Sequence, residues 1–138
     1  MAYKHLFLDS DVLLDMFLKR EPFFFHTQIL LIECIKGKIE LRTSSLVIAN
    51  IVYVLRKQVG IIKAKENLKN LFNSAKVLPF EFDAIETAIS SDITDFEDAI
   101  QFHIAQKHNC DAIITRNIKD YKNSTIPVLT AEQFLNTL

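Results

Sequence analysis

The amino-acid sequence predicts an α/β sandwich with helices around a short, mostly parallel central sheet. Short apolar segments with the length of buried strands alternate with segments of helical periodicity, which is typical of parallel α/β folds. The chain has 138 residues and no internal repeat, low-complexity segment or linker, so we expect one domain over residues 1–138. Hydrophobic residues make up 49% and charged residues 24%, as in ordinary soluble globular proteins.

The first half of the chain predicts two strands and three helices. An apolar run ends at Asp9, and apolar residues then recur at helical spacing. Pro22 suits the first turn of the next helix, and Gly37 is typical of a helix end. The hydroxyls of residues 43–45 offer a cap for the third helix. In order, the expected elements are strand Tyr3–Leu8, helix Asp11–Leu18, helix Pro22–Lys36, strand Ile39–Arg42 and helix Leu46–Gln58.

The second half continues the alternation of strands and helices. Gly60 separates two helical segments, and the lysines of the second one predict an exposed face. The pattern Thr94-x-x-Glu97 resembles a capping box at the start of a later helix. In order, the expected elements are helix Ile61–Asn73, strand Val77–Pro79, helix Asp83–Ser90, helix Phe96–His108, strand Ala112–Thr115, strand Pro127–Leu129 and helix Glu132–Leu138.

Composition excludes several classes of protein. Only two glycines are present, so the chain lacks the glycine-rich loops that bind nucleotide phosphates. The net charge of −1 gives no overall cationic field for nucleic acid. Cys34 and Cys110 lie far apart, which indicates reduced thiols. No apolar run approaches the roughly 20 residues of a membrane span, and the first residues lack the apolar core of a signal peptide. We therefore expect a cytoplasmic protein that does not contact membranes.

Acidic residues follow the strands and helices in three places. Asp9 and Asp11 follow the first strand, an acidic group lies at residues 92–98, and Asp120 follows the strand that ends at Thr115. Ligands bind at the carboxyl ends of the strands in open α/β sheets. Carboxylates without Cys or His suit a hard cation such as Mg²⁺ or Mn²⁺. Such an ion could polarise a phosphoryl oxygen and activate water.

Each acid also has a purely structural interpretation. Asp95 could cap the helix that follows it, and acids in a first helical turn complement the helix dipole. Asp11 could cap the first helix, with Asp15 on its solvated side. For any single acid the structural interpretation is favoured. Taken together, with one acid at the end of the first strand, the acids favour a metal site.

Three segments resemble the signatures of PIN domains. They are Leu6–Asp15 (LFLDSDVLLD), Asp95–Ala99 (DFEDA) and Ile113–Tyr121 (IITRNIKDY). The resemblance extends to Pro127–Leu129 and so covers nearly the whole chain. It implies a three-layer sandwich and a metal-dependent endoribonuclease that cleaves RNA with Mg²⁺ or Mn²⁺, similar to VapC-type toxins. It also implies an antitoxin protein as partner and a homodimer.

The resemblance assigns roles residue by residue. Asp9 matches the first acidic ligand of the family and Asp98 the third, with Asp95 in the same pocket. Asn117 matches the fourth polar position, and Asp120 is close enough in sequence to assist. We therefore expect Asp9, Asp95, Asp98 and Asp120 to be catalytic, and the first three of them to hold the metal. Residues expected to contact the substrate or ordered water are Ser10, Asn50, Thr115, Arg116 and Asn117.

Asn50 departs from the family pattern. The family usually places a Glu on the helix after the second strand, where the segment Ser45–Asn50 here ends in an amide. An amide oxygen can ligate a metal but brings no charge, so fewer carboxylates attract the ion. A second hypothesis follows: a catalytically degenerate PIN fold that serves only as a binding module.

A third hypothesis is a phosphohydrolase of the haloacid-dehalogenase type. Asp9-Ser10-Asp11 after an apolar strand fits its first motif, with Asp9 as the covalent nucleophile. That family usually has a longer chain, and its final acidic pair follows the other motifs. Here the acids of residues 95–98 precede the strand that ends at Thr115, which is the opposite order. This hypothesis is therefore the least favoured.

Overall fold

The fold is a five-stranded sheet between layers of helices. A computed structural model describes residues 3–138. All strand pairs are parallel, in the order β3-β2-β1-β4-β5. The strands are β1 (His5–Leu8), β2 (Glu40–Ser44), β3 (Ala75–Leu78), β4 (Ala112–Ile114) and β5 (Val128–Leu129). The predicted α/β class is confirmed, and the sheet is entirely parallel where the sequence predicted a mostly parallel one.

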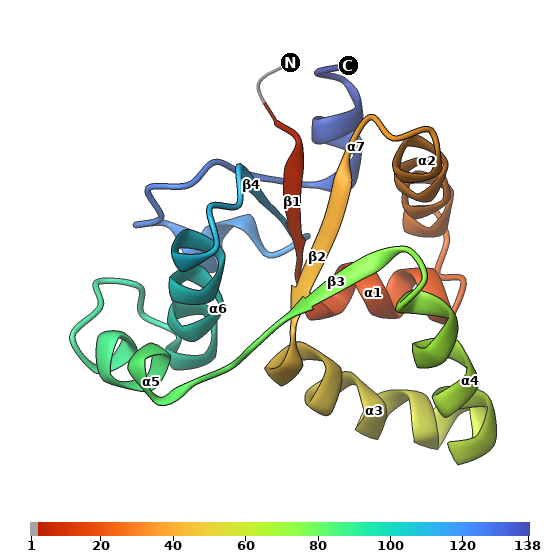
Figure 1. The fold of residues 1–138 in the computed structure, drawn as a ribbon, viewed down its shortest axis with the longest axis horizontal. Coiled ribbons are helices and arrows are strands. Elements are labelled where there is room, and N and C mark those ends of the chain that lie inside the picture. Colours follow the sequence, from red (N-terminus) through yellow and green to blue (C-terminus); the bar gives the residue numbers. More distant parts are fainter. Residues whose placement is uncertain (1–2) are drawn as a thin grey trace.

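Two groups of helices cover the sheet. In Figure 1, α5 and α6 lie on one side of β1, and the larger group lies on the other side. The larger group consists of α1 (Ser10–Phe17), α2 (Phe23–Ile35), α3 (Ser45–Val59), α4 (Ile61–Leu71) and α7 (Ala131–Leu135). The smaller group consists of α5 (Phe82–Ile89) and α6 (Phe96–Lys107), and a 3₁₀ turn η1 (Ile118–Tyr121) lies against α6.

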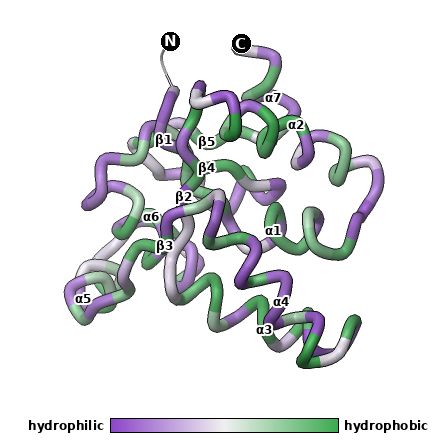
Figure 2. The backbone as a smooth tube through the Cα atoms, turned by 45° about the vertical axis from the view of Figure 1, so that its right-hand side comes forward, coloured by the Kyte–Doolittle hydropathy of each residue, from purple (hydrophilic) through white to green (hydrophobic). Residues whose placement is uncertain are grey.

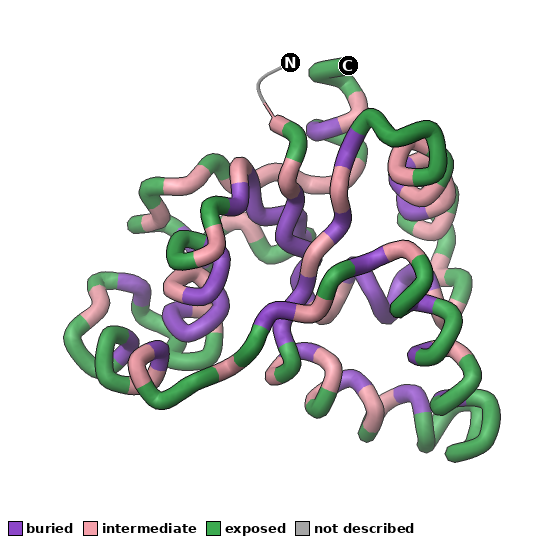
Figure 3. Tube along the Cα trace, in the orientation of Figure 1, coloured by how far each residue is buried: buried purple, intermediate pink, exposed green. Residues whose placement is uncertain are grey.

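The two central strands form the core. Leu6, Phe7 and Leu8 of β1 and all residues of β4 are buried, as the tube in Figure 3 shows. A strand that is covered on both faces reads as a continuous apolar run, which is why these segments were recognisable. Figure 2 shows hydrophobic and hydrophilic stretches alternating along the outer helices. Within residues 3–138 no helix is both long enough and apolar enough to span a membrane.

Helix starts gather at the carboxyl edge of the sheet. Asp9 caps α1, because its side chain accepts a hydrogen bond from the Ser10 amide. Ser44 caps α3 and Asp95 caps α6 in the same manner. The expected caps at Ser44 and Asp95 are therefore confirmed. The capping roles suggested for Asp11 and for the Thr94-x-x-Glu97 pattern are wrong, because Asp9 and Asp95 occupy those positions.

The chain changes direction across the sheet next to β1. From β1 it runs through α1 and α2 to β2 and β3, and then crosses to β4 on the opposite side of β1. Leu8 pairs with Ile114, so Asp9 and Thr115 emerge side by side. Such a switch point is where open parallel sheets bind their ligands.

Candidate active site

An acidic pocket opens at the carboxyl ends of β1 and β4. It receives side chains from the start of α1, the start of α6 and the segment after β4. Its lining residues are Asp9, Ser10, Asp11, Leu14, Arg20, Asp95, Glu97, Asp98, Asn117 and Asp120. We call this group the acidic pocket. Six of these ten side chains are carboxylates, so the pocket has a strongly negative potential and attracts cations.

Asp9 lies at the floor of the acidic pocket and is held from several directions. Its side chain is 7% exposed. One oxygen accepts the Ser10 amide at 2.8 Å. The other accepts the Tyr121 hydroxyl at 3.0 Å and lies 3.1 Å from the Thr115 hydroxyl. Burial raises the pKa of Asp9, and these hydrogen bonds offset part of that increase. The carboxylate is thus fixed in one orientation before any ligand arrives.

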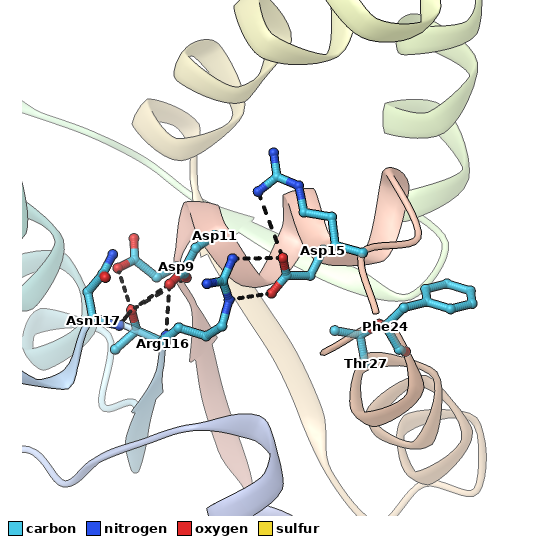
Figure 4. Close-up of polar contacts among 9 residues, drawn as sticks. Asp9, Asp11, Asp15, Phe24, Thr27, Arg116 and Asn117 are labelled. Atoms are coloured by element: carbon cyan, nitrogen blue, oxygen red, sulfur yellow. Dashed lines mark hydrogen bonds and ion pairs between the residues drawn. The ribbon is translucent and has the colours of Figure 1, made fainter. Parts of the chain in front are cut away.

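Asp11 connects α1 with the segment after β4. Its Oδ2 accepts the Arg116 amide at 2.8 Å and lies 3.3 Å from the Thr115 hydroxyl. Figure 4 shows Asp11 beside Asp9 and Arg116. Burial and the negative charge of Asp9 raise the pKa of Asp11. Because Thr115 contacts both carboxylates, it sets the spacing between them. From the sequence alone, Asp11 fits only a cap or part of the phosphohydrolase motif.

Asp98 faces Asp9 from the first turn of α6. Burial raises its pKa to about 7, with further contributions from the charges of Asp9, Asp95 and Asp120. Asp95 Oδ1 accepts the Asp98 amide at 2.9 Å and so fixes the start of the helix. Burial, together with Asp9 and Asp98, raises the pKa of Tyr121 far above its ordinary value. Tyr121 therefore stays a neutral hydroxyl that donates a hydrogen bond to Asp9.

Asn50 is hydrogen-bonded to Glu97, a carboxylate that lines the acidic pocket. It lies on α3, and its Nδ2 donates to Glu97 Oε1 on α6 at 2.9 Å. Glu97 lines the pocket beside Asp98. Sequence analysis included Glu97 in the acidic group but gave it no catalytic role. The signal that could have identified it is its position one residue before Asp98.

Arg116 points away from the acidic pocket. Its guanidinium donates to both oxygens of Asp15, at 2.8 and 2.9 Å (Figure 4). It also lies 4.1 Å above the ring of Phe23. Asp15 is 1% exposed, so its suggested place on the solvated side of α1 is wrong. A buried carboxylate needs a paired cation, and Arg116 supplies it. The Arg116 side chain thus makes a structural ion pair, and its contact with the substrate stays a prediction.

The other predicted site residues gather as expected. Asp9, Ser10, Asp95, Asp98, Asn117 and Asp120 line the acidic pocket, and Thr115 lies fully buried at its floor. Asn50 contacts it only through Glu97. Tyr121 was quoted in a motif but given no role. Its contact with Asp9 joins residues 112 positions apart, which local sequence patterns do not report.

The donor chemistry of the acidic pocket fits a hard divalent cation. Over residues 3–138, no three His, Cys, Asp or Glu side chains converge closely enough to form a complete metal cage. Mg²⁺ typically keeps several waters and binds proteins through only one or two carboxylates. Asp9, Asp95 and Asp98, around a shared opening, satisfy that smaller requirement.

Comparison with known proteins identifies the family. The family model described as PIN domain matches residues 5–119, which is most of the chain. The chain belongs to the PIN domain family. Ribonuclease VapC1 of Aquifex aeolicus (strain VF5) is 30% identical over 139 residues, covering 97% of this chain and 95% of the relative. The expected resemblance to VapC-type PIN proteins is therefore confirmed, and the haloacid-dehalogenase hypothesis is wrong.

Solved structures of PIN-type toxins share the fold. A toxin-antitoxin complex from Klebsiella pneumoniae is 20% identical with a TM-score of 0.68, and the match covers 91% of this chain and 97% of that chain. Mycobacterium tuberculosis VapC20, described as a sarcin-ricin loop cleaving toxin, is 17% identical with a TM-score of 0.62, covering 78% and 86%. At these identities the likeness concerns the three-layer PIN fold alone.

Proposed function

We propose that this PIN-family protein is a VapC-type ribonuclease that hydrolyses RNA phosphodiester bonds with Mg²⁺ or Mn²⁺ in the acidic pocket. The observation that carries the proposal is the gathering of Asp9, Asp95 and Asp98 at the switch point of the sheet. Asp9 is held there by three hydrogen-bond donors. Preorganised carboxylates are what a nuclease metal site needs.

Different residues of the chain have different roles in the proposed reaction. Asp9 and Asp98 would hold the ion directly or through water, with Asp95 beside them. When bound, the ion would polarise a phosphoryl oxygen and lower the pKa of a water molecule. Thr115 and Tyr121 fix the orientation of Asp9. Asn117 and Asp120, at the rim of the acidic pocket, would contact ordered water or the substrate.

We assign phosphate contacts to two lysines beside the acidic pocket. Lys119 and Lys122 line a hollow that adjoins the acidic pocket and shares Asp95 and Asp120 with it. Ammonium groups beside a cleavage site can hold the phosphates that flank the scissile bond. This local patch suits RNA binding by a chain whose net charge is −1.

The comparisons also suggest a biological setting. The Klebsiella pneumoniae structure is a toxin-antitoxin complex, and a Salmonella typhimurium relative is a DNA-bound VapBC. We infer that this protein likewise acts as the toxin of such a pair and binds an antitoxin protein. The expected homodimer stays a prediction.

A cleavage time course tests the proposed function. The purified protein, free of any inhibitor, is incubated with mixed RNA substrates and Mg²⁺ or Mn²⁺, with EDTA and Asp98→Asn as controls. We expect cleavage that is lost in both controls, by about a hundredfold or more when the metal carboxylate is removed. A folded wild-type protein that cuts no RNA would support the degenerate binding module instead.

A further inference from the structure

We infer that Glu97, oriented by Asn50, supplies from α6 the carboxylate that other family members place on α3. The inference rests on the proposed function, because it concerns the same metal pocket. Asn50 stands where the family usually has a Glu, so the chain lacks a carboxylate at that position. The structure places another carboxylate against it, since Asn50 Nδ2 lies 2.9 Å from Glu97 Oε1.

The direction of the contact matters. Asn50 donates and Glu97 accepts, so the amide serves to hold a carboxylate. The sequence interpretation gave Asn50 itself the role of a neutral ligand. The geometry points to different roles for the two residues: Asn50 is a positioning residue, and Glu97 brings the negative charge.

Glu97 shares the acidic pocket with the other acids. It lines the acidic pocket together with Asp9 and Asp98. The negative charge of Glu97 also contributes to the raised pKa of Asp9. A carboxylate at this position restores the negative charge that Asn50 removes from the α3 side. This carboxylate adds to the acids that attract a divalent cation.

A purely structural role for the Asn50–Glu97 pair does not explain why an exposed carboxylate is held at this position. The contact is exposed, and exposed polar pairs contribute little to folding stability. Glu97 lies in the first turn of α6, where its negative charge interacts favourably with the helix dipole whether or not Asn50 holds it. The buried hydrogen bond from Ser44 to Gln101, at 2.7 Å, already joins the start of α3 to α6. A role toward the metal accounts for an exposed carboxylate that is held at the rim of the acidic pocket.

Mn²⁺ affinity measured by titration calorimetry tests the inference. The variants are Glu97→Gln, Asn50→Ala and the exchange variant Asn50→Glu/Glu97→Gln, in the full chain. Glu66→Gln, whose exposed carboxylate pairs with Lys63 on α4, is the matched control. We expect Glu97→Gln and Asn50→Ala to weaken Mn²⁺ binding about tenfold, as the loss of groups that ligate or orient at metal sites commonly does. The exchange variant should regain most of this loss, and the control should match the wild type.

Melting temperatures separate this role from a structural one. Since the pair is exposed, all variants should melt within about 2 °C of the wild type without metal, as for a change under 0.5 kcal/mol. Wild-type affinity in Glu97→Gln would overturn the inference and leave the proposed function intact. An exchange variant no better than Glu97→Gln would contradict the equivalence of the two positions. A wild-type protein that binds no Mn²⁺ would overturn both proposals.

Discussion

Among single residues, Asp98 is the one whose protonation matters most for the acidic pocket. Burial and the charges of Asp9, Asp95 and Asp120 raise its pKa from 3.8 to about 7. Between these two values the folded protein holds a proton that the unfolded chain has released. Folding stability from this group is therefore present below pH 4 and is lost as the pH rises towards 7. At neutral pH the charged pocket is destabilising until a cation binds there.

Replacing Asp98 should accordingly stabilise the metal-free protein. We expect Asp98→Asn to raise the melting temperature in EDTA at pH 8 by roughly 3–8 °C, for about 1–2 kcal/mol after solvent screening. At pH 3 the effect should nearly disappear, because the wild-type group is then mostly protonated in both the folded and the unfolded state. Asp92→Asn, an exposed acid outside the acidic pocket, is the control. Equal melting temperatures at pH 8 would show that Asp98 does not experience the charges of its neighbours.

Arg116 illustrates the opposite case, a charge that folding requires. Removing its guanidinium would leave buried Asp15 with only Arg20, at 3.8 Å. We expect Arg116→Ala to lower the free energy of unfolding by about 2 kcal/mol, less than for a fully buried pair that loses one partner, because the Arg116 side chain is 32% exposed. Arg116→Lys should recover part of the loss, since it keeps the charge but not the two-pronged geometry. Urea unfolding measures both, and a loss under about 1 kcal/mol for the alanine variant would contradict the structural role.

At the level of elements, two acids have a double function. Asp9 caps α1 and Asp95 caps α6, and both line the acidic pocket. The capping role of these acids is therefore compatible with the proposed metal-binding role. Helix starts gather at the carboxyl edge because each follows a parallel strand or faces its end, and capping acids at that edge form the pocket.

Substitutions at Asp9 can separate its two functions. Asn caps helices about as well as Asp, so we expect Asp9→Asn to fold with at least wild-type stability while losing RNA cleavage and the response to Mn²⁺. Asp9→Ala should lose both the cap and the site, at a cost of about 1–2 kcal/mol. Thermal melts with and without Mn²⁺, together with the cleavage assay, distinguish the two variants. A Mn²⁺ response in Asp9→Asn equal to that of the wild type would remove Asp9 from the metal site.

The elements themselves were largely predictable from the sequence. Apolar runs such as Leu6–Leu8 and Ala112–Ile114 are buried on both faces and have the composition of central parallel strands. Single contacts were not predictable in the same way. Asp15 appeared to lie on a solvated helix face, because its partner Arg116 is 101 residues away in sequence. Tyr121 and Glu97 escaped assignment for the same reason, since tertiary contacts gave them their roles.

For the whole molecule, the order of the strands creates the site. β1 and β4 are separated by more than 100 residues, yet their pairing places Asp9 beside Thr115. The segment after β4 then supplies Asn117 and Asp120, while α6 supplies Asp95 and Asp98. The sequence could predict that these acids lie at one edge of the sheet. The pairing of β1 with β4 decides which of these acids lie next to one another.

The most direct test of a metal site in the acidic pocket is a crystal structure of the protein with Mn²⁺, with the ion located by anomalous scattering. We predict an anomalous peak among Asp9, Asp95 and Asp98, with the closest carboxylate oxygen about 2.1 Å from the ion, as is usual for a small divalent cation. Asp9→Asn crystals treated in the same way should lack that peak. An acidic pocket without a peak at millimolar Mn²⁺, or a peak elsewhere only, would contradict a metal-dependent nuclease.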